Sequence, residues 1–190
     1  DLVMHSGTKY LGGHSDLICG TVNGSAALVA SARDHAVAYG GCLNAQDCYL
    51  LERSLKTLEL RVRRQSDNAG LIAALLDADD RVKKVHYPGL EDHPGHAIAA
   101  RQMQGFGGML SFELADDIDP IGYIRRLALV NCAISLGGVE TTICQPVATS
   151  HQKVSEEERQ RLGITDGLLR LSVGIEDAED ISDDLLQALG

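Results

Sequence analysis

The sequence predicts an α/β fold in which a mixed β-sheet carries helices on one face. Two observations support this class. After residue 80, short strand-like stretches alternate with amphipathic helical stretches, and before it a helical pattern without proline runs from residue 44 to about residue 79. The chain has 190 residues, of which 44% are hydrophobic, enough for one substantial core or two modest ones. We therefore expect two structural parts joined by the long helical stretch.

The first part should contain two short strands and a helix. Residues 1–4 are apolar and strand-like, and residues 17–22 form a second apolar stretch that suits a short buried strand ending at an Asn-Gly pair. Residues 25–39 carry alanine and aliphatic side chains at helical spacing. The Gly-Gly pair that follows should end this helix.

The central helical stretch covers residues 44–79. Its apolar positions are Leu50, Leu51, Leu55, Leu58 and Val62 in the first half and Leu71, Leu75 and Leu76 in the second. We interpret this stretch as one helix, or a bent pair of helices, that joins the two parts.

The last part alternates strands with helices. Strand patterns cover residues 82–87, 109–114 and 168–173, and helical patterns cover residues 93–104, 120–129, 155–159 and 177–189. Pro120 suits the first turn of its helix, and Ser155 suits the cap of a short helix. A mixed sheet with helices on one face follows from this alternation.

Lys9 lies in a glycine-bearing turn directly after the first strand-like stretch, beside the hydroxyl residues Ser6 and Thr8. A primary amine becomes a nucleophile toward an aldehyde when it is held out of bulk water or near other positive charge. Hydroxyl and backbone N–H groups in a turn suit a phosphate. A phosphate-bearing aldehyde cofactor, pyridoxal phosphate, would satisfy both requirements. From this segment alone, a solvated loop lysine beside ordinary turn or cap residues is the alternative.

Five segments follow one another in an order that resembles a known enzyme family. They are Ser6-x-Thr8-Lys9-Tyr10-x-x-Gly13-His14-Ser15-Asp16 and, further along, residues 51–58, 86–90, 135–140 and 169–177. Together they resemble the Cys/Met-metabolism enzymes that use pyridoxal phosphate: cystathionine γ-synthase, the cystathionine β- and γ-lyases, methionine γ-lyase and the homoserine sulfhydrylases. The resemblance extends over nearly the whole chain.

This resemblance implies a fold-type I PLP-dependent transferase of the aspartate aminotransferase-like kind. Residues 1–53 would be the C-terminal part of the large cofactor domain, and residues 54–190 would be the small C-terminal domain with the linking helix. Because the family places its lysine about midway along the polypeptide, we expect this chain to be the C-terminal half of an enzyme and to be inactive alone. The full-length protein is expected to be a homotetramer built from dimers.

The resemblance also implies roles for single residues. Lys9 would hold pyridoxal 5′-phosphate as an aldimine, with Ser6 and Thr8 on the phosphate. Arg170 lies in an aliphatic strand, where a charge is costly unless it meets an anion. A structural salt bridge is one explanation; the family's use of this arginine for the α-carboxylate of the substrate is the other. Ser135 would lie beside the lysine and that carboxylate.

The implied activity is that of a carbon-sulfur lyase in transsulfuration and sulfur amino-acid metabolism. Lys9 would move protons at Cα and Cβ while a γ-substituent leaves. Cystathionine-handling relatives often carry a glutamate where this chain has Ile134, so the sequence favours γ-elimination on methionine-like substrates. Residues 137–140 are closer to cystathionine γ-synthase or cystathionine γ-lyase, which is the alternative. A non-catalytic oligomerisation module is a second alternative.

Charge and hydropathy argue against two other classes of protein. The net charge is −10 and no basic stripe is present, which argues against a nucleic-acid partner. No apolar run approaches the roughly 20 residues that span a bilayer. The expected partner is therefore a small-molecule amino-acid substrate, with neither nucleic acid nor membrane.

Cysteine and histidine spacing argues against a metal site. The five cysteines are odd in number and lack a C-x-x-C pair, which fits a reducing cytoplasm and neither a disulfide framework nor zinc. His93 and His96 suit a loop that enters a helix, with no metal bound. The glycines of residues 105–108 precede a strand, so they do not suit a nucleotide-binding loop.

Overall fold

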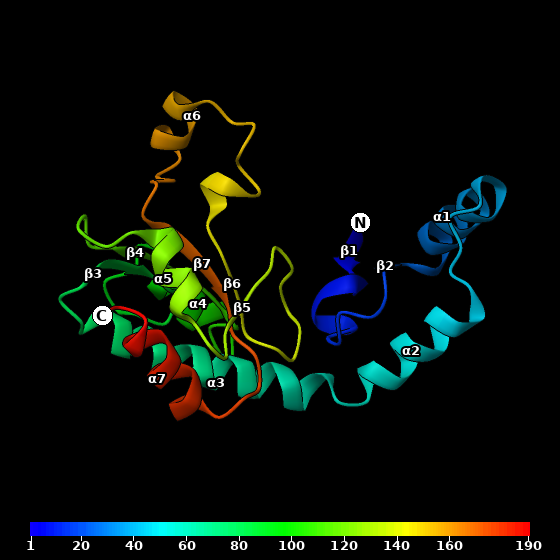
Figure 1. The fold of residues 1–190 in the computed structure, drawn as a ribbon. Coiled ribbons are helices and arrows are strands. Elements are labelled where there is room, and N and C mark those ends of the chain that lie inside the picture. The colour runs from blue at the N-terminus through cyan, green and yellow to red at the C-terminus, as the bar shows by residue number, and fades with distance from the viewer. The chain divides into compact units, whose positions relative to one another are not determined.

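The computed structural model describes residues 1–190 and contains both strands and helices (Figure 1). The residues divide into two units, Asp1–Glu59 and Leu60–Gly190. The first unit contains a two-stranded sheet and the second a five-stranded sheet. The expected α/β class is confirmed. No helix combines the length and the apolar character that a membrane span needs.

The sheet of the first unit pairs β1 (Leu2–Ser6) with β2 (Gly20–Gly24) in antiparallel register. Between them, the turn η1 (Gly7–Leu11) carries the predicted cofactor lysine. Our prediction of a buried strand at residues 17–22 is wrong: the strand begins at Gly20 and none of its residues is buried. Leu17 and Cys19 are buried, but they lie before the strand and pack against the η1 turn.

Helix α1 (Ala26–Tyr39) confirms the helix expected at residues 25–39. The Ser25 hydroxyl accepts a hydrogen bond from the Leu28 N–H at 3.5 Å and caps the helix. Gly40 ends the helix with φ +78°. This left-handed conformation costs glycine little free energy, because glycine has no Cβ. The Gly-Gly pair therefore predicted the correct end.

The long helical stretch consists of two helices, α2 (Ala45–Leu55) and α3 (Leu58–Asp77), with residues 56–57 between them. Asn44 caps α2 by accepting the Asp47 N–H at 2.9 Å. Between the two helices, Lys56 N–H and Thr57 N–H donate to the carbonyls of Arg53 and Ser54, three residues earlier. These tighter bonds end α2. Of the two expected alternatives, one helix or a pair of helices, the pair is therefore confirmed.

The sheet of the second unit has the strand order β3-β4-β7-β6-β5. The strands are β3 (Val82–His86), β4 (Met109–Leu114), β5 (Asn131–Cys132), β6 (Thr142–Cys144) and β7 (Leu168–Ser172). Only β5 and β6 are parallel, so the sheet is mixed, as expected. The sequence did not predict β5 and β6, because two and three residues are too few to show a period of two.

The two faces of this sheet differ. Leu169 and Leu171 of β7 belong to the hydrophobic core, together with residues of α3, α5 (Pro120–Arg126) and α7 (Ala178–Gln187). Because side chains alternate along a strand, Arg170 and Ser172 of β7 lie on the opposite face. The helices that build the core therefore cover one face, as expected, and the other face carries Arg170.

Helix α5 is shorter than the stretch expected at residues 120–129. It ends at Arg126 because the next backbone N–H groups bind the buried carboxylate of Asp184 instead of helix carbonyls. Ala128, Leu129 and Val130 donate to this carboxylate at 2.8, 2.9 and 2.8 Å. Asp184 thus ties α7 to the segment that leads into β5.

The remaining helices are also capped locally. Helix α4 (His96–Gln102) starts later than the expected residue 93, because the Gly95 N–H donates to Nδ1 of His93 in a turn. Helix α6 (Glu156–Arg161) begins after Ser155, whose hydroxyl accepts the Glu158 N–H, as expected. The short 3₁₀ helix η2 (Pro146–Ala148) was not predicted.

Candidate active site

Lys9 lies in the middle of the η1 turn, where its non-helical backbone, with φ −93° and ψ −124°, interrupts the turn. Two backbone hydrogen bonds close the turn around it: Gly12 N–H donates to the Gly7 carbonyl at 2.8 Å, and Gly13 N–H donates to the Lys9 carbonyl at 2.7 Å. The backbone that carries the lysine is therefore held on both sides.

Thr8 ties the same turn to the chain that returns toward β2. Its backbone N–H donates to the Cys19 carbonyl at 3.2 Å. Its hydroxyl donates to that carbonyl at 3.3 Å and accepts the Cys19 N–H at 3.0 Å. Gly7 makes this approach possible, since a Cβ at Gly7 would overlap the sulfur of Cys19.

His14 holds the far end of the turn. Its Nδ1 lies 2.7 Å from the Gly12 carbonyl, so this nitrogen carries a proton and donates it. The hydroxyl of the buried Ser54, on α2, lies 3.3 Å from the same nitrogen. The sequence did not indicate a role for Ser54, because nothing in its helix period distinguishes it.

The side chains of Lys9 and Ser6 have no hydrogen bond or ion pair with the rest of the chain, and Lys9 is half-buried. A free hydroxyl at the start of the turn and a free primary amine within it thus lie three residues apart in the chain. This donor set fits a group that carries an aldehyde and a phosphate, such as pyridoxal phosphate. The Thr8 hydroxyl is already engaged by Cys19.

Arg170 projects from β7 toward a turn formed by residues 134–138, called here the 134–138 turn. Its Nη2 donates to the carbonyls of Ile134 and Ser135 at 2.5 and 3.3 Å. Its Nε is buried and has no hydrogen-bond partner. None of the ion pairs involves Arg170, so the salt bridge that was one explanation for this residue is absent. An unpaired buried N–H costs free energy, which an incoming carboxylate could offset.

The backbone of the 134–138 turn is bound by side chains from several elements. Thr142 of β6 donates to the Ser135 carbonyl at 3.2 Å. Ser172 of β7 accepts the Gly137 N–H at 2.8 Å. Gln65 of α3 donates to the Gly138 carbonyl at 2.6 Å. The sequence did not indicate roles for Gln65 and Ser172; the only signal was a polar residue at a buried helix position and one at a buried strand position.

The side chains of this turn are left available. Ile134 is 62% exposed although it is apolar. The Ser135 hydroxyl has no hydrogen-bond partner within the chain. The structure thus groups the six predicted site residues into two clusters: Ser6, Thr8 and Lys9 in the first unit, and Ile134, Ser135 and Arg170 in the second.

Known proteins resemble this chain along its whole length. The family model described as Cys/Met metabolism PLP-dependent enzyme matches residues 1–190. Cystathionine gamma-synthase 1, chloroplastic, of Arabidopsis thaliana is 46% identical over 190 residues, which are 100% of this chain and 34% of that protein. L-methionine gamma-lyase of Fusobacterium nucleatum subsp. polymorphum is 43% identical over 192 residues, covering 100% of this chain and 49% of that protein. Other relatives are named cystathionine beta-lyase and cystathionine gamma-lyase.

Solved structures share the fold. The crystal structure of cystathionine gamma synthase from Xanthomonas oryzae pv. oryzae in complex with cystathionine has a TM-score of 0.94 and 46% identity, and the match covers 100% of this chain and 49% of that one. The chain therefore spans about half the length, or less, of the relatives it matches.

Proposed function

Because this chain belongs to the Cys/Met metabolism PLP-dependent enzyme family, we propose that the full-length protein is a carbon-sulfur lyase of sulfur amino-acid metabolism. The observation that carries the proposal is the η1 turn: its backbone is fixed by hydrogen bonds, while the Lys9 amine and the Ser6 hydroxyl are free. A fixed turn that presents an unpaired amine is what attachment of an aldehyde cofactor requires.

Lys9 would hold pyridoxal 5′-phosphate, and Ser6 would donate to its phosphate, while Thr8, whose hydroxyl is bonded to Cys19, would keep the turn in place. When bound, this cofactor supplies an electron sink for bonds broken at Cα of an amino acid. The Lys9 amine would act as the proton carrier of the site. Once the substrate amine has replaced it on the cofactor, the freed amine would take the proton from Cα and pass it to the bound cofactor. It would then take a proton from Cβ and give it to the sulfur of the departing γ-substituent.

Arg170 would bind the α-carboxylate of the amino-acid substrate. This role is supported by its buried, unpartnered Nε and by the absence of an acidic partner. A planar guanidinium suits a carboxylate because it can donate two parallel hydrogen bonds. Ser135, whose carbonyl is tied to Arg170, would contribute its free hydroxyl beside the same carboxylate.

The proposed substrate is methionine or a similar uncharged thioether. It is supported by the exposed, apolar Ile134, which offers no charge to a second ammonium group. Cystathionine γ-synthase or γ-lyase activity is the second candidate, supported by relatives that carry these names at 46% and 45% identity.

We propose the domain division 1–53 for the C-terminal part of the cofactor domain and 54–190 for the small domain, supported by the nearby interruption between α2 and α3. A homotetramer built from dimers is proposed from the family alone. A cytoplasmic location is supported by the five cysteines, all of which are free.

Reduction with borohydride tests the proposal in the full-length protein. The reagent makes a covalent link between lysine and cofactor permanent, so peptide mapping should find the label on Lys9 and none should form in Lys9→Ala. Lys56, Lys83, Lys84 and Lys153 serve as internal controls. A label on any of these lysines would refute the assignment of Lys9.

A further inference from the structure

Gln65 is a buried amide at a helix position that packing alone would fill with an apolar residue. It is 0% exposed, and the buried residues that follow on α3 are Asn68, Ala69, Ile72, Ala73 and Leu76. Its Nε2 donates to the Gly138 carbonyl at 2.6 Å, while its Oε1 is buried without a partner. Because an unpaired buried acceptor costs free energy, Gln65 is a poor choice for stability alone.

Ser172 makes a matching contact from the sheet. It lies two residues after Arg170 on β7, so both side chains lie on the same face. Its buried hydroxyl accepts the Gly137 N–H at 2.8 Å. Gly137 has φ +74°, and the hydroxyl fixes the turn at this left-handed residue.

These contacts complete a pattern around the 134–138 turn. Arg170 binds the carbonyls of Ile134 and Ser135, Ser172 binds the N–H of Gly137, and Gln65 binds the carbonyl of Gly138. Every one of these bonds goes to the turn's backbone. The side chains of Ile134 and Ser135 stay free for a ligand.

We infer that Gln65 and Ser172 are positioning residues: they fix the 134–138 turn and thereby hold Ser135 and the Arg170 guanidinium in the geometry that binds the α-carboxylate of an amino acid. The inference rests on the proposed function, since it needs a carboxylate site at Arg170. A loosened turn would adopt the binding-competent geometry only part of the time. The apparent Kd would then equal the intrinsic Kd divided by the fraction of molecules in that geometry.

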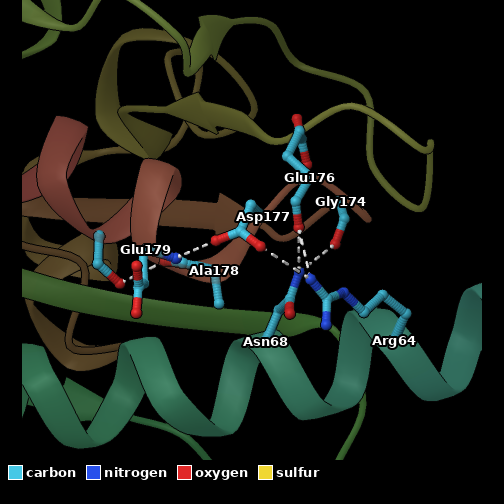
Figure 2. Close-up of polar contacts among 8 residues, drawn as sticks. Arg64, Asn68, Gly174, Glu176, Asp177, Ala178 and Glu179 are labelled. Carbon is cyan, nitrogen blue, oxygen red and sulfur yellow. Dashed lines mark hydrogen bonds and ion pairs between the residues drawn. The ribbon is translucent and has the colours of Figure 1, made fainter.

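Asn68 provides a matched control. It is one helical turn beyond Gln65, is 0% exposed, and also has an unpartnered buried oxygen. Its Nδ2, however, donates to the carbonyls of Gly174 and Glu176 at 3.2 and 2.9 Å, as Figure 2 shows. Both carbonyls lie after β7 and outside the 134–138 turn. Gln65 and Asn68 are therefore similar in burial and chemistry but hold different segments.

Titration of the full-length holoenzyme with L-alanine tests the inference. L-Alanine has the α-amine and α-carboxylate of every proposed substrate but no sulfur, and its binding is followed by the visible absorption of the cofactor. We expect Gln65→Met and Ser172→Ala to raise the Kd for L-alanine about tenfold, because the turn is ordered only part of the time. Asn68→Leu should leave this Kd unchanged and lower the melting temperature.

Amide hydrogen exchange gives a second measurement that does not depend on turnover. The Gly137 amide, which donates to Ser172, should exchange faster in Gln65→Met and Ser172→Ala than in the unmodified protein, and at the unmodified rate in Asn68→Leu. If Ser172→Ala does not fold, Gln65→Met decides the question alone, since a near-isosteric apolar side chain also removes the unpartnered Oε1.

The possible results separate the two proposals. If the unmodified protein binds L-alanine and Gln65→Met binds it equally well, the inference is wrong and the proposed function stands. The inference is also wrong if all three variants only melt earlier with the Kd unchanged. If the unmodified protein binds no L-alanine, the proposed function fails and the inference falls with it.

Discussion

The hydroxyl of Thr8 makes two hydrogen bonds to the backbone of Cys19, donating to the carbonyl at 3.3 Å and accepting the N–H at 3.0 Å. The sequence led us to expect Thr8 and Ser6 to share one role, contact with a cofactor phosphate. In the structure only Ser6 has a free hydroxyl. Mutations at the two positions should therefore have different effects.

Thr8→Val should destabilise the turn that carries Lys9. It keeps the shape of the side chain but removes both hydroxyl bonds to Cys19, a loss of about 2 kcal/mol of unfolding free energy at roughly 1 kcal/mol per bond. Thr8→Ser should restore most of it. Ser6→Ala is the matched control, which should weaken cofactor binding without lowering the melting temperature of the cofactor-free protein. Equal stability of Thr8→Val and the unmodified protein would contradict this account.

Arg170→Lys should lower kcat/KM of the full-length enzyme by about 10²-fold, equivalent to roughly 3 kcal/mol, because an ammonium cannot donate two parallel hydrogen bonds to a carboxylate. Arg161→Lys, on α6 with an exposed ion pair to Glu158, is the control and should leave kcat/KM unchanged. Steady-state kinetics on folded protein decides the matter. Normal turnover in an Arg170→Lys variant that melts early would mean that the residue is structural.

Ile134→Glu should change substrate preference. A carboxylate at this exposed position would give cystathionine's second ammonium group a partner, which methionine does not need. The ratio of kcat/KM for cystathionine over methionine should rise by roughly tenfold, the effect of about 1.4 kcal/mol. Ile134→Leu should keep the original ratio. A strong preference of the unmodified enzyme for cystathionine would favour the second candidate function instead.

Asp184 should make stability depend on acidic pH. Burial by itself raises the pKa of this carboxyl, but hydrogen bonds from the backbone of Ala128, Val130 and Leu129 and from the Gln187 amide outweigh it, and the pKa lies below its ordinary value. Because the folded pKa is depressed, the stabilisation is complete above the unfolded pKa of about 3.9 and is lost as the pH falls toward the folded value.

Asp184→Asn should lower the unfolding free energy at pH 7 by about 2 kcal/mol, since hydrogen bonds to a charged acceptor contribute about 1.5–3 kcal/mol each and an amide keeps part of them. It should also flatten the fall in stability below pH 4. Asp183→Asn, exposed on the same helix, should change neither quantity. Urea unfolding between pH 2.5 and pH 7 measures both, and parallel curves for Asp184→Asn and the unmodified protein would exclude the effect.

Two glycines should respond in opposite ways to alanine. A Cβ at Gly174 would overlap the Val139 carbonyl and the Glu176 carboxylate, so Gly174→Ala should lose about 3 kcal/mol, the upper range for overpacking. Gly70 lies within α3 with open space around it. Gly70→Ala should gain about 0.5–1 kcal/mol from helix propensity. Thermal unfolding of the two variants tests the pair, and a stable Gly174→Ala would contradict the contact.

Local patterns predicted most helices and strands because their signals lie within a few residues. The alternation of β4 appears as alternating half-buried and buried residues, and Ser25 and Asp177 cap the helices that the sequence indicated, the latter through the Glu179 N–H in Figure 2. The strands β5 and β6 were missed because two and three residues show no period of two, and only pairing with each other and with β7 makes them strands. The start of β2 was predicted wrongly because Leu17 and Cys19 are buried by a turn and not by a sheet.

The residues of the candidate site also divide into those that a local sequence pattern indicates and those that only tertiary contacts reveal. Motifs indicated Lys9 and Arg170, because their neighbours in sequence form recognisable segments. They could not indicate Gln65, whose partner Gly138 is 73 residues away, or that the Arg170 Nε is buried and unpaired. Those facts depend on tertiary contacts, which a single sequence does not encode in any local period.

The alternation of β7 limits how this strand can evolve. Leu169 and Leu171 fill the core from one face, while Arg170 and Ser172 serve the 134–138 turn from the other. Inserting or deleting one residue within Leu168–Ser172 would send the arginine into the hydrocarbon interior and leucines to the opposite face. Single residues of this strand can be substituted, but a change in the length of the strand would impair folding and ligand binding together.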